Sequence, residues 1–205
     1  MISTKWPISG FTAIIIFCVF TFIAIIVSPT PLTALNNNLS SLGDFYDNPN
    51  GALFFNLGMV FSGLFCIFLY YGLYYSFLEK NSHSLMNIQI IAGLLNSFAL
   101  IMAGIFSETM ETYSIHEFWS LVIFITFLPI LFCISTILLE YPKYKKIAYY
   151  GFIVALIDFI FLIMLMFSGI ETNIPIFEWF SVFSYIGWIG WLSLKIELRE
   201  LLANQ

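Results

Sequence analysis

Six long apolar segments, separated by short polar stretches, account for most of the chain. They cover approximately residues 8–27, 51–77, 86–106, 117–139, 147–169 and 177–195. Each segment can cross ~30 Å of hydrocarbon, because an α-helix rises ~1.5 Å per residue. The first run is longer than the apolar core of a secretory signal, and no A-x-A cleavage site follows it. The pattern predicts an all-α fold, with residues 1–205 forming one domain of six retained transmembrane helices.

Composition supports a membrane protein. Of the 205 residues, 60% are hydrophobic and only 9% are charged, whereas soluble domains carry about 25% charged residues. All seven basic residues fall on the face that six crossings assign to both termini: Lys5, Lys80, Lys143, Lys145, Lys146, Lys195 and Arg199. Short cytoplasmic loops carry an excess of Lys and Arg. We therefore expect a multi-pass protein of the cell membrane with both termini in the cytoplasm.

The opposite, outer face is acidic and carries the longest polar interruption, residues 28–50. This stretch runs directly into the second apolar segment. Asp47 or Asn48 is suited to cap that helix, with Pro49 in its first turn. The sequon Asn38-Leu39-Ser40 lies on the side where glycosylation occurs, and the sequence leaves its modification open.

Two further features concern the fourth helix. Ser114-x-x-Glu117 has the spacing of a capping box, which predicts that the helix opens there. Pro129 lies in the middle of the segment, where its ring interrupts the helical hydrogen bonds and predicts a kink.

Two polar residues lie near the predicted bilayer midplane, Asp158 and Asn96. No Lys or Arg lies inside any span, so burial favours the neutral acid at Asp158. Its proton can then be donated to Asn96 or to a Ser or Thr hydroxyl. One interpretation is a proton relay or substrate site. The other is interhelical hydrogen bonding that specifies packing, and the sequence alone does not choose between them.

A second group of polar residues gathers at the outer ends of the helices: Asp47, Asn50, Asn56, Glu108, Glu111, His116, Glu171 and Glu178. A histidine near carboxylates can serve as a general base or a metal ligand. One histidine with scattered acids has no metal-ligand spacing, so we expect neither a metal nor another cofactor. The alternative is that these side chains only cap helix ends.

The sequence also excludes several classes of protein. It has no G-x-S-x-G, H-E-x-x-H, Walker or Rossmann motif. It has no arginine row of a voltage sensor and no T-V-G-Y-G filter. With its few basic residues confined to loops and ends, it has no basic face for nucleic acid.

The residues from Leu42 to Gly58 follow the order L-G-x-x-x-x-N-P-N-x-x-x-F-x-N-x-G. A G-I-F-S-E turn follows at Gly104 to Glu108, and then His116 begins the next helix. This arrangement resembles the family called domain of unknown function 998, small six-helix membrane proteins of archaea and bacteria. The resemblance covers about residues 8–194 and implies a fold and a membrane address but no reaction.

The resemblance also singles out particular residues and one departure. The motif residues that it transfers to this chain are Asn48, Asn50, Asn56, Gly58, Glu108 and His116. The family's usual residue after G-x-F is proline, whereas this chain has Ser107. That difference weakens the transfer at the end of the third helix.

Three functions are compatible with these patterns. The first is binding of a lipid headgroup, a small solute or a membrane partner through an outer polar pocket. The second is a lipid-modifying enzyme of the outer leaflet, with His116 as base, Glu108 or Asp47 orienting it, and Asn56 donating hydrogen bonds. The third is a small proton-coupled transporter that uses Asp158. The sequence leaves the ligand and the oligomeric state open.

Overall fold

The computed structural model describes residues 6–78, 83–168 and 175–203. Within these residues there are six α-helices, two short 3₁₀ helices and no strand, which confirms the all-α prediction. The α-helices are α1 (Trp6–Val27), α2 (Ala52–Leu78), α3 (His83–Ile105), α4 (Tyr113–Leu139), α5 (Lys145–Ser168) and α6 (Pro175–Ala203). The 3₁₀ helices are η1 (Ser40–Gly43), before α2, and η2 (Pro142–Tyr144), before α5.

Among the described residues, five helices, α1 to α5, are long and apolar enough to cross a membrane. The protein is therefore a membrane-spanning helical protein. The α6 helix is as long as the others, but it is rich in Trp, Tyr, Ser and Gly, which lower its mean hydropathy. Its crossing of the membrane, and with it the position of both termini, stays a prediction.

Two predicted helix boundaries are wrong. The α4 helix begins at Tyr113, four residues before the predicted start, so Ser114 lies inside the first turn and forms no capping box. Thr112 precedes the helix, and its hydroxyl donates to the carbonyl of Ser107. The α6 helix continues to Ala203 instead of ending near 195. The predicted end was the end of the apolar span, which hydropathy marks. The helix continues past it because the Lys, Glu, Leu and Arg residues that follow are strong helix formers.

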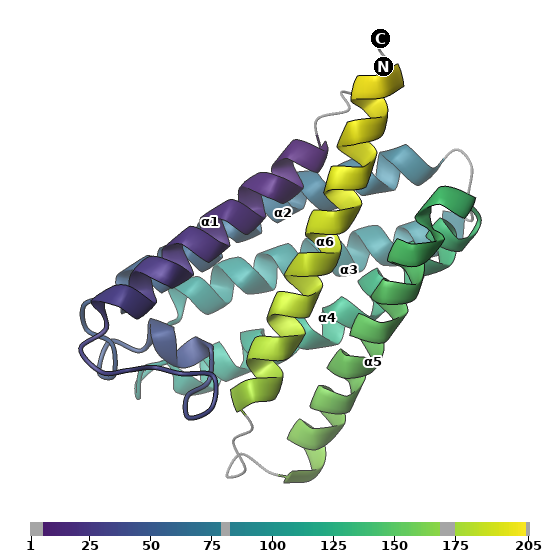
Figure 1. Cartoon of the computed structure of the whole chain (residues 1–205). Helices are drawn as coiled ribbons and strands as arrows, with labels where there is room; N and C mark the ends of the chain where they lie inside the picture. Colours follow the sequence, from purple (N-terminus) through teal and green to yellow (C-terminus); the bar gives the residue numbers. More distant parts are fainter. Residues whose placement is uncertain (1–5, 79–82, 169–174, 204–205) are drawn as a thin grey trace.

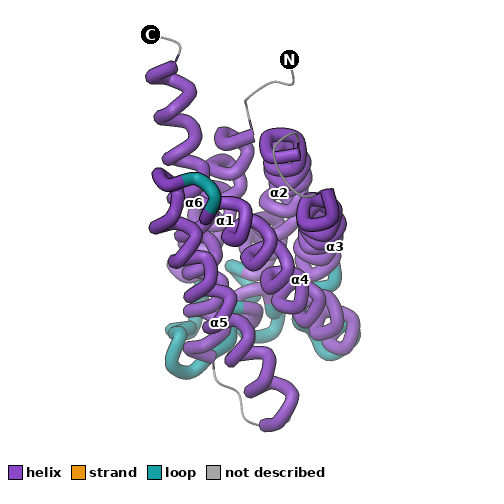
Figure 2. The backbone as a smooth tube through the Cα atoms, turned by 90° about the vertical axis from the view of Figure 1, so that its right-hand side faces the viewer, coloured by secondary structure: helices purple, strands orange, loops and turns teal. Residues whose placement is uncertain are grey.

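The helices pack as a closed ring in chain order, because each contacts the next and α6 returns to contact α1 (Figure 1). The beginning of α1 and the end of α6 lie at one end of the bundle. Residues 28–51 and the connection from α3 to α4 lie at the other end, where Figure 2 shows the loops gathered. We call this the acidic end, since residues 28–51 and 106–112 contain acids but no Lys or Arg.

Close packing inside the ring places the central side chains. Gly93 on α3 faces the ring of Tyr70 on α2, and a Cβ at this glycine would collide with that ring. Ser62 on α2 donates to the carbonyl of Ala13 on α1 over 3.0 Å. Small residues therefore let the backbones approach closely, which replaces the hydrophobic driving force that helices lack in lipid.

Candidate functional site

Asn48 fixes the shape of the polar segment at the acidic end. Its side chain is fully buried, and its Nδ2 donates to the carbonyls of Ala24 and Leu42 over 3.2 and 3.0 Å. Its Oδ1 accepts from the amide of Gly51 over 3.1 Å. Of the two predicted caps for α2, the structure therefore uses Asn48. Because its amide is engaged on both sides, Asn48 shapes the segment and is not free to bind a ligand.

Asn56 attaches α2 to η1. The side chain is 5% exposed, and its Nδ2 donates to the carbonyl of Gly43 over 3.0 Å. Its Oδ1 is buried with no hydrogen-bond partner. The two remaining polar residues predicted here, Asp47 and Asn50, are exposed. They lie near the site along the chain but contribute no buried polar atom to it.

Glu178, in the first turn of α6, holds η1 in place. Its Oε2 accepts from the amide of Leu39 over 3.1 Å, and its Oε1 accepts from the amide of Ser40 over 3.2 Å. Both oxygens therefore act as acceptors at once. The neighbouring Trp179 donates from Nε1 to the carbonyl of Asn37 over 3.0 Å. The polar segment is therefore attached to α6 as well as to α1 and α2.

His116, on the first turn of α4, is 4% exposed. Its Nδ1 lies 3.0 Å from the carbonyl oxygen of Ala103 and 2.8 Å from that of Phe106, both at the end of α3. Only an N–H can contact two carbonyl oxygens favourably, so Nδ1 carries a hydrogen. Nε2 is buried and has no partner. Backbone carbonyls orient this ring, where the enzyme hypothesis expected Glu108 or Asp47.

Glu108 lies in the connection between α3 and α4, beside Ser40. Burial raises the pKa of this carboxyl from 4.5 to about 7, and a hydrogen bond with Ser40 opposes the rise. The negative charges of Asp44, Asp47 and Glu117 raise the pKa further. Its Oε2 is buried without a hydrogen-bond partner. Glu108 therefore changes its charge near neutral pH.

A cavity of about 50 Å³ is lined by two of these residues, His116 and Glu178, and we call it the acidic-end cavity. Its polar lining comes from Ser40 of η1, His116 and Ser120 of α4, and Glu178 of α6. The other lining residues are apolar. The sequence predicted His116 and Glu178 as site residues but not the two serines. Ser120 had one signal in the sequence: it follows His116 by four residues, which places both on the same face of a helix. Glu171, which was also predicted here, lies outside the described residues.

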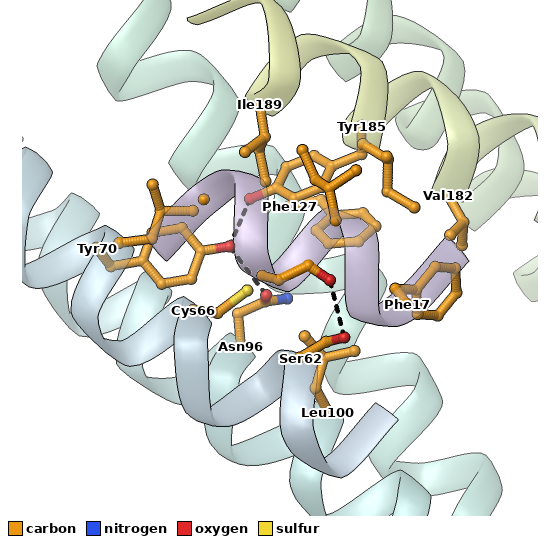
Figure 3. A pocket seen from close by; sticks show the side chains of 15 residues that line it. Phe17, Ser62, Cys66, Tyr70, Asn96, Leu100, Phe127, Val182, Tyr185 and Ile189 are labelled. Carbon is orange, nitrogen blue, oxygen red and sulfur yellow. Dashed lines mark hydrogen bonds between the residues drawn. The ribbon is translucent and has the colours of Figure 1, made fainter. Parts of the chain in front are cut away.

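Asn96 belongs to a separate polar network at the centre of the bundle (Figure 3). The hydroxyl of Tyr70 donates to its Oδ1 over 3.1 Å, and the hydroxyls of Tyr70 and Tyr185 lie 2.7 Å apart. Its Nδ2 donates to Thr126 Oγ1 over 2.9 Å and to the carbonyl of Ile123 over 3.2 Å. The network joins α2, α3, α4 and α6, as expected for hydrogen bonding that specifies packing.

Asp158 does not pair with Asn96. It is fully buried on α5, and its Oδ1 accepts from Ser181 Oγ of α6 over 2.9 Å. A serine hydroxyl is therefore the partner, but it donates to Asp158, whereas the sequence predicted that the protonated acid would donate. Its Oδ2 is buried and has no partner. The residue links α5 to α6 with only one of its two oxygens.

A second cavity, of about 60 Å³, lies beside the central network, and we call it the central cavity. Figure 3 shows side chains from α1, α2, α3, α4 and α6 around it. Four residues line both cavities: Phe17, Leu100, Phe127 and Val182. The two cavities are therefore neighbours along the bundle axis. In the part of the chain that the structure describes, no three His, Cys, Asp or Glu side chains are grouped to hold a metal ion.

Comparison with known proteins addresses the family and not the reaction. No curated protein and no solved structure matches the chain. A family model described as "Protein of unknown function (DUF998)" matches residues 11–195, which confirms the resemblance carried by the Leu42 to Gly58 motif. The chain belongs to the DUF998 family of membrane proteins.

Proposed function

We propose that the protein binds a small protonated amine in the acidic-end cavity. The observation that carries this proposal is that His116, a residue whose Nε2 is buried without a partner, lines the same cavity as Glu178. A buried acceptor without a partner costs free energy, which a donor from a ligand recovers. A carboxylate beside that acceptor favours a donor that is also a cation.

The charge of the whole acidic end supports a cationic ligand. Residues 28–51 and 106–112 contain no Lys or Arg. Asp44, Asp47 and Glu117 are close enough to raise the pKa of Glu108. Acids of one sign around a site of low dielectric attract cations and repel anions. An anionic headgroup or solute therefore fits this site poorly.

Hydrogen-bond chemistry narrows the ligand to an amine with N–H groups. His116 Nε2 offers a lone pair, and each oxygen of Glu178 keeps a lone pair beyond the amide that it accepts. A primary ammonium has three N–H donors, whereas a quaternary ammonium has none. The amine can belong to a lipid headgroup or to a free solute.

The setting of this site is also part of the proposal. Lys143, Lys145 and Lys146, in η2 and at the start of α5, lie at the end of the bundle opposite the site. By the positive-inside rule, that end faces the cytoplasm and both termini lie there. The acidic-end cavity then opens toward the outer face of the cell membrane.

A general base also needs a free Nε2, so the same atom is compatible with the enzyme hypothesis. A catalytic histidine is usually oriented by a carboxylate that stabilises its charged form. In His116 the contacts to Nδ1 are the carbonyls of Ala103 and Phe106. The geometry therefore favours binding over catalysis.

Proton-coupled transport through Asp158 is the second proposal. It rests on one observation, the buried Oδ2 that has no partner. Ionisable groups of this kind inside a membrane bundle are often part of a proton or substrate path.

The test of amine binding uses the full chain in phosphatidylcholine nanodiscs. We expect ethylamine hydrochloride to raise the unfolding temperature saturably, while tetramethylammonium chloride and sodium acetate leave it unchanged. His116→Asn keeps an N–H near the Ala103 and Phe106 carbonyls but removes the ring acceptor, so affinity for ethylamine should fall about tenfold or more. Glu111→Gln is the matched control at an exposed acid of the same end, and it should change the affinity less than threefold.

Nanodiscs that contain phosphatidylethanolamine separate the two sources of the amine. If the lipid headgroup occupies the site, these nanodiscs should stabilise the protein and weaken ethylamine binding, and His116→Asn should abolish both effects. If the ligand is a free amine, the lipid composition should leave ethylamine binding unchanged. Equal behaviour of ethylamine and tetramethylammonium in the wild-type protein would contradict the proposal.

A further inference from the structure

The wall of the acidic-end cavity is built from α-helices except where η1 contributes to it. The lining residues belong to α1, α2, α3, α4 and α6, apart from Leu39 and Ser40, which lie at the start of η1. We call residues 37–43 the cover segment. It lies among the loops at the acidic end (Figure 2). This part of the wall can move without separating two packed helices, whereas the rest of the wall cannot.

One side chain secures the two amides at the start of η1. Glu178 of α6 accepts from the amides of Leu39 and Ser40 over 3.1 and 3.2 Å. The backbone hydrogen bonds of η1 begin only at the next amide, that of Ser41, which donates to the carbonyl of Asn38. The first N–H groups of a helix have no acceptor in its own backbone. The Leu39 and Ser40 amides therefore depend on Glu178, a residue that also lines the cavity.

The two ends of the cover segment are held differently. At one end Gly43 is buried, and Asn56 of α2 donates to its carbonyl over 3.0 Å. At the other end Asn37 is half-buried, and Trp179 of α6 donates from Nε1 to its carbonyl over 3.0 Å. Trp179 does not line the cavity. The Gly43 end is therefore the fixed end, and the Asn37 end is the one that can move away from α6.

From these contacts we infer that the cover segment is a lid over the amine site, that Glu178 latches it, and that a bound amine holds it closed. The inference rests on the proposed function, because the amine site supplies the ligand. It adds the regulation of that site, since opening of the lid admits the amine and closing retains it. Glu178 links the two events, because it accepts from the lid and lines the cavity.

The charge of Glu178 couples the ligand to the lid. An ionised carboxylate accepts hydrogen bonds from amides more strongly than a neutral carboxyl group does. Glu108 opposes that charge electrostatically, and it also hydrogen-bonds to Ser40. An ammonium group beside Glu178 offsets this repulsion and favours the ionised form. Binding of the amine should therefore strengthen the two hydrogen bonds to the lid, and by reciprocity a closed lid should strengthen binding.

The experiment measures hydrogen exchange of the full chain in phosphatidylcholine nanodiscs by mass spectrometry of peptides, with and without ethylamine hydrochloride. Calorimetry on the same preparation establishes that ethylamine is bound. If the amine binds only under a closed lid, ethylamine at about ten times its Kd should slow exchange of the peptide over residues 37–43 about tenfold. The internal control is η2, the other 3₁₀ helix, at the opposite end of the bundle. Its exchange should not change.

Trp179→Phe loosens the lid without altering the lining of the cavity. It removes the donor to Asn37 and keeps an aromatic ring to stack on Phe183. Without ligand, the 37–43 peptide should exchange about fivefold faster than in the wild type, as expected for the loss of one hydrogen bond. Trp191→Phe, at an exposed Trp farther along the same helix, is the matched control and should leave that exchange unchanged.

Two results would overturn the inference and leave the amine site standing. One is ethylamine binding, shown by calorimetry, that leaves exchange of the 37–43 peptide unchanged or slows it no more than that of η2. The other is equal exchange of this peptide in the wild type, Trp179→Phe and Trp191→Phe. If Trp179→Phe does not fold, the comparison of wild-type protein with and without ethylamine still decides. Failure of ethylamine to bind the wild type would overturn both the lid and the amine site.

Discussion

The acidic-end cavity and the central network are two clusters of buried polar side chains that differ in one respect. In the central network, Asn96 hydrogen-bonds to Tyr70, Thr126 and the carbonyl of Ile123. Both the oxygen and the nitrogen of its side-chain amide therefore have partners. At the acidic end, His116 lines the cavity, and its Nε2 is buried without a partner. Glu108 Oε2, outside the cavity lining, is also buried without a partner. The first cluster is complete within the protein, whereas the second is not.

This difference separates packing from binding. A satisfied polar network in a bundle stabilises one arrangement of helices, because any other arrangement leaves donors and acceptors unpaired. An incomplete cluster costs free energy until a ligand supplies the missing group. Substitutions in the centre should therefore reduce stability and leave binding intact, and substitutions at the acidic end should do the reverse.

The largest expected effect comes from breaking the central network. Asn96→Leu removes its hydrogen bonds and leaves the Tyr70 hydroxyl without its acceptor, so unfolding in mixed micelles should become easier by about 2–3 kcal/mol. Asn87→Leu, at an exposed position on the same helix, is the matched control and should cost less than about 1 kcal/mol. Equal losses in the two variants would mean that the central network has no special structural role.

The next effect separates the two nitrogens of His116. His116→Leu removes the donor to Ala103 and Phe106 as well as the free acceptor, so it should lower stability by about 1 kcal/mol and abolish ethylamine binding. His116→Asn should restore most of the stability and none of the binding. The checks are denaturant unfolding and calorimetry on the same preparations. Recovery of binding in His116→Asn would show that Nε2 is not the ligand-binding atom.

A smaller effect is a pH dependence of stability at the acidic end. The pKa of Glu108 is raised from 4.5 to about 7, so the folded protein binds its proton more tightly than the unfolded chain does. This contribution is fully present below pH 4.5 and is lost as the pH rises to about 7 and beyond. Unfolding measured between pH 4 and 8 should show this decline, and Glu108→Gln should reduce it. An unchanged slope in Glu108→Gln would assign the decline to another group.

Ionisation of Glu108, which lowers the stability of the fold, should raise the affinity for the amine. As the pH rises through about 7, Glu108 becomes negative and attracts a cation more strongly. Ethylamine affinity should therefore increase severalfold between pH 6 and 8 in the wild-type protein and increase less in Glu108→Gln, where Glu178 is the remaining carboxyl at the site. Calorimetry at matched ionic strength measures this directly.

The smallest expected effect is at Asp158. Asparagine in its place keeps an oxygen that accepts from Ser181, so Asp158→Asn should change the free energy of unfolding by less than about 1 kcal/mol. Ethylamine affinity should not change. In proteoliposomes with a pH-sensitive dye inside, a proton flux in the wild type that disappears in Asp158→Asn would favour the transport proposal. Equal fluxes in the two proteins would leave Asp158 a packing residue.

The fold was largely predictable because its signals are local. Five of the six predicted spans were confirmed as apolar helices long enough to cross a membrane, and the sixth as a helix. The start of α4 was not predictable from the sequence. Ser114 and Glu117 have the spacing of a capping box, but this spacing does not reveal whether the two residues lie at the helix end or inside its first turn. The choice of Thr112 depends on its contact with the carbonyl of Ser107, in the preceding connection.

The candidate site was predictable only in its general location. The sequence placed Asp47, Asn48, Asn50, Asn56, Glu108 and His116 at one end of the helices, and it treated them alike. The structure separates them into a buried cap, two exposed residues and three residues that each have a buried, unpartnered atom. Nothing in the local sequence distinguishes these outcomes, because each depends on what the rest of the chain brings to the same place.

By itself, the amino-acid sequence determined the helices, their membrane character and the family, because hydropathy and motif spacing act over neighbouring residues. Only the tertiary structure decided that Glu178 accepts from Leu39 and Ser40, residues almost 140 positions away. It also decided that Asp158 meets Ser181 and not Asn96. The physical reason is that a buried polar atom is satisfied or left free by its partners in space, and those partners are set by how the six helices close into a ring.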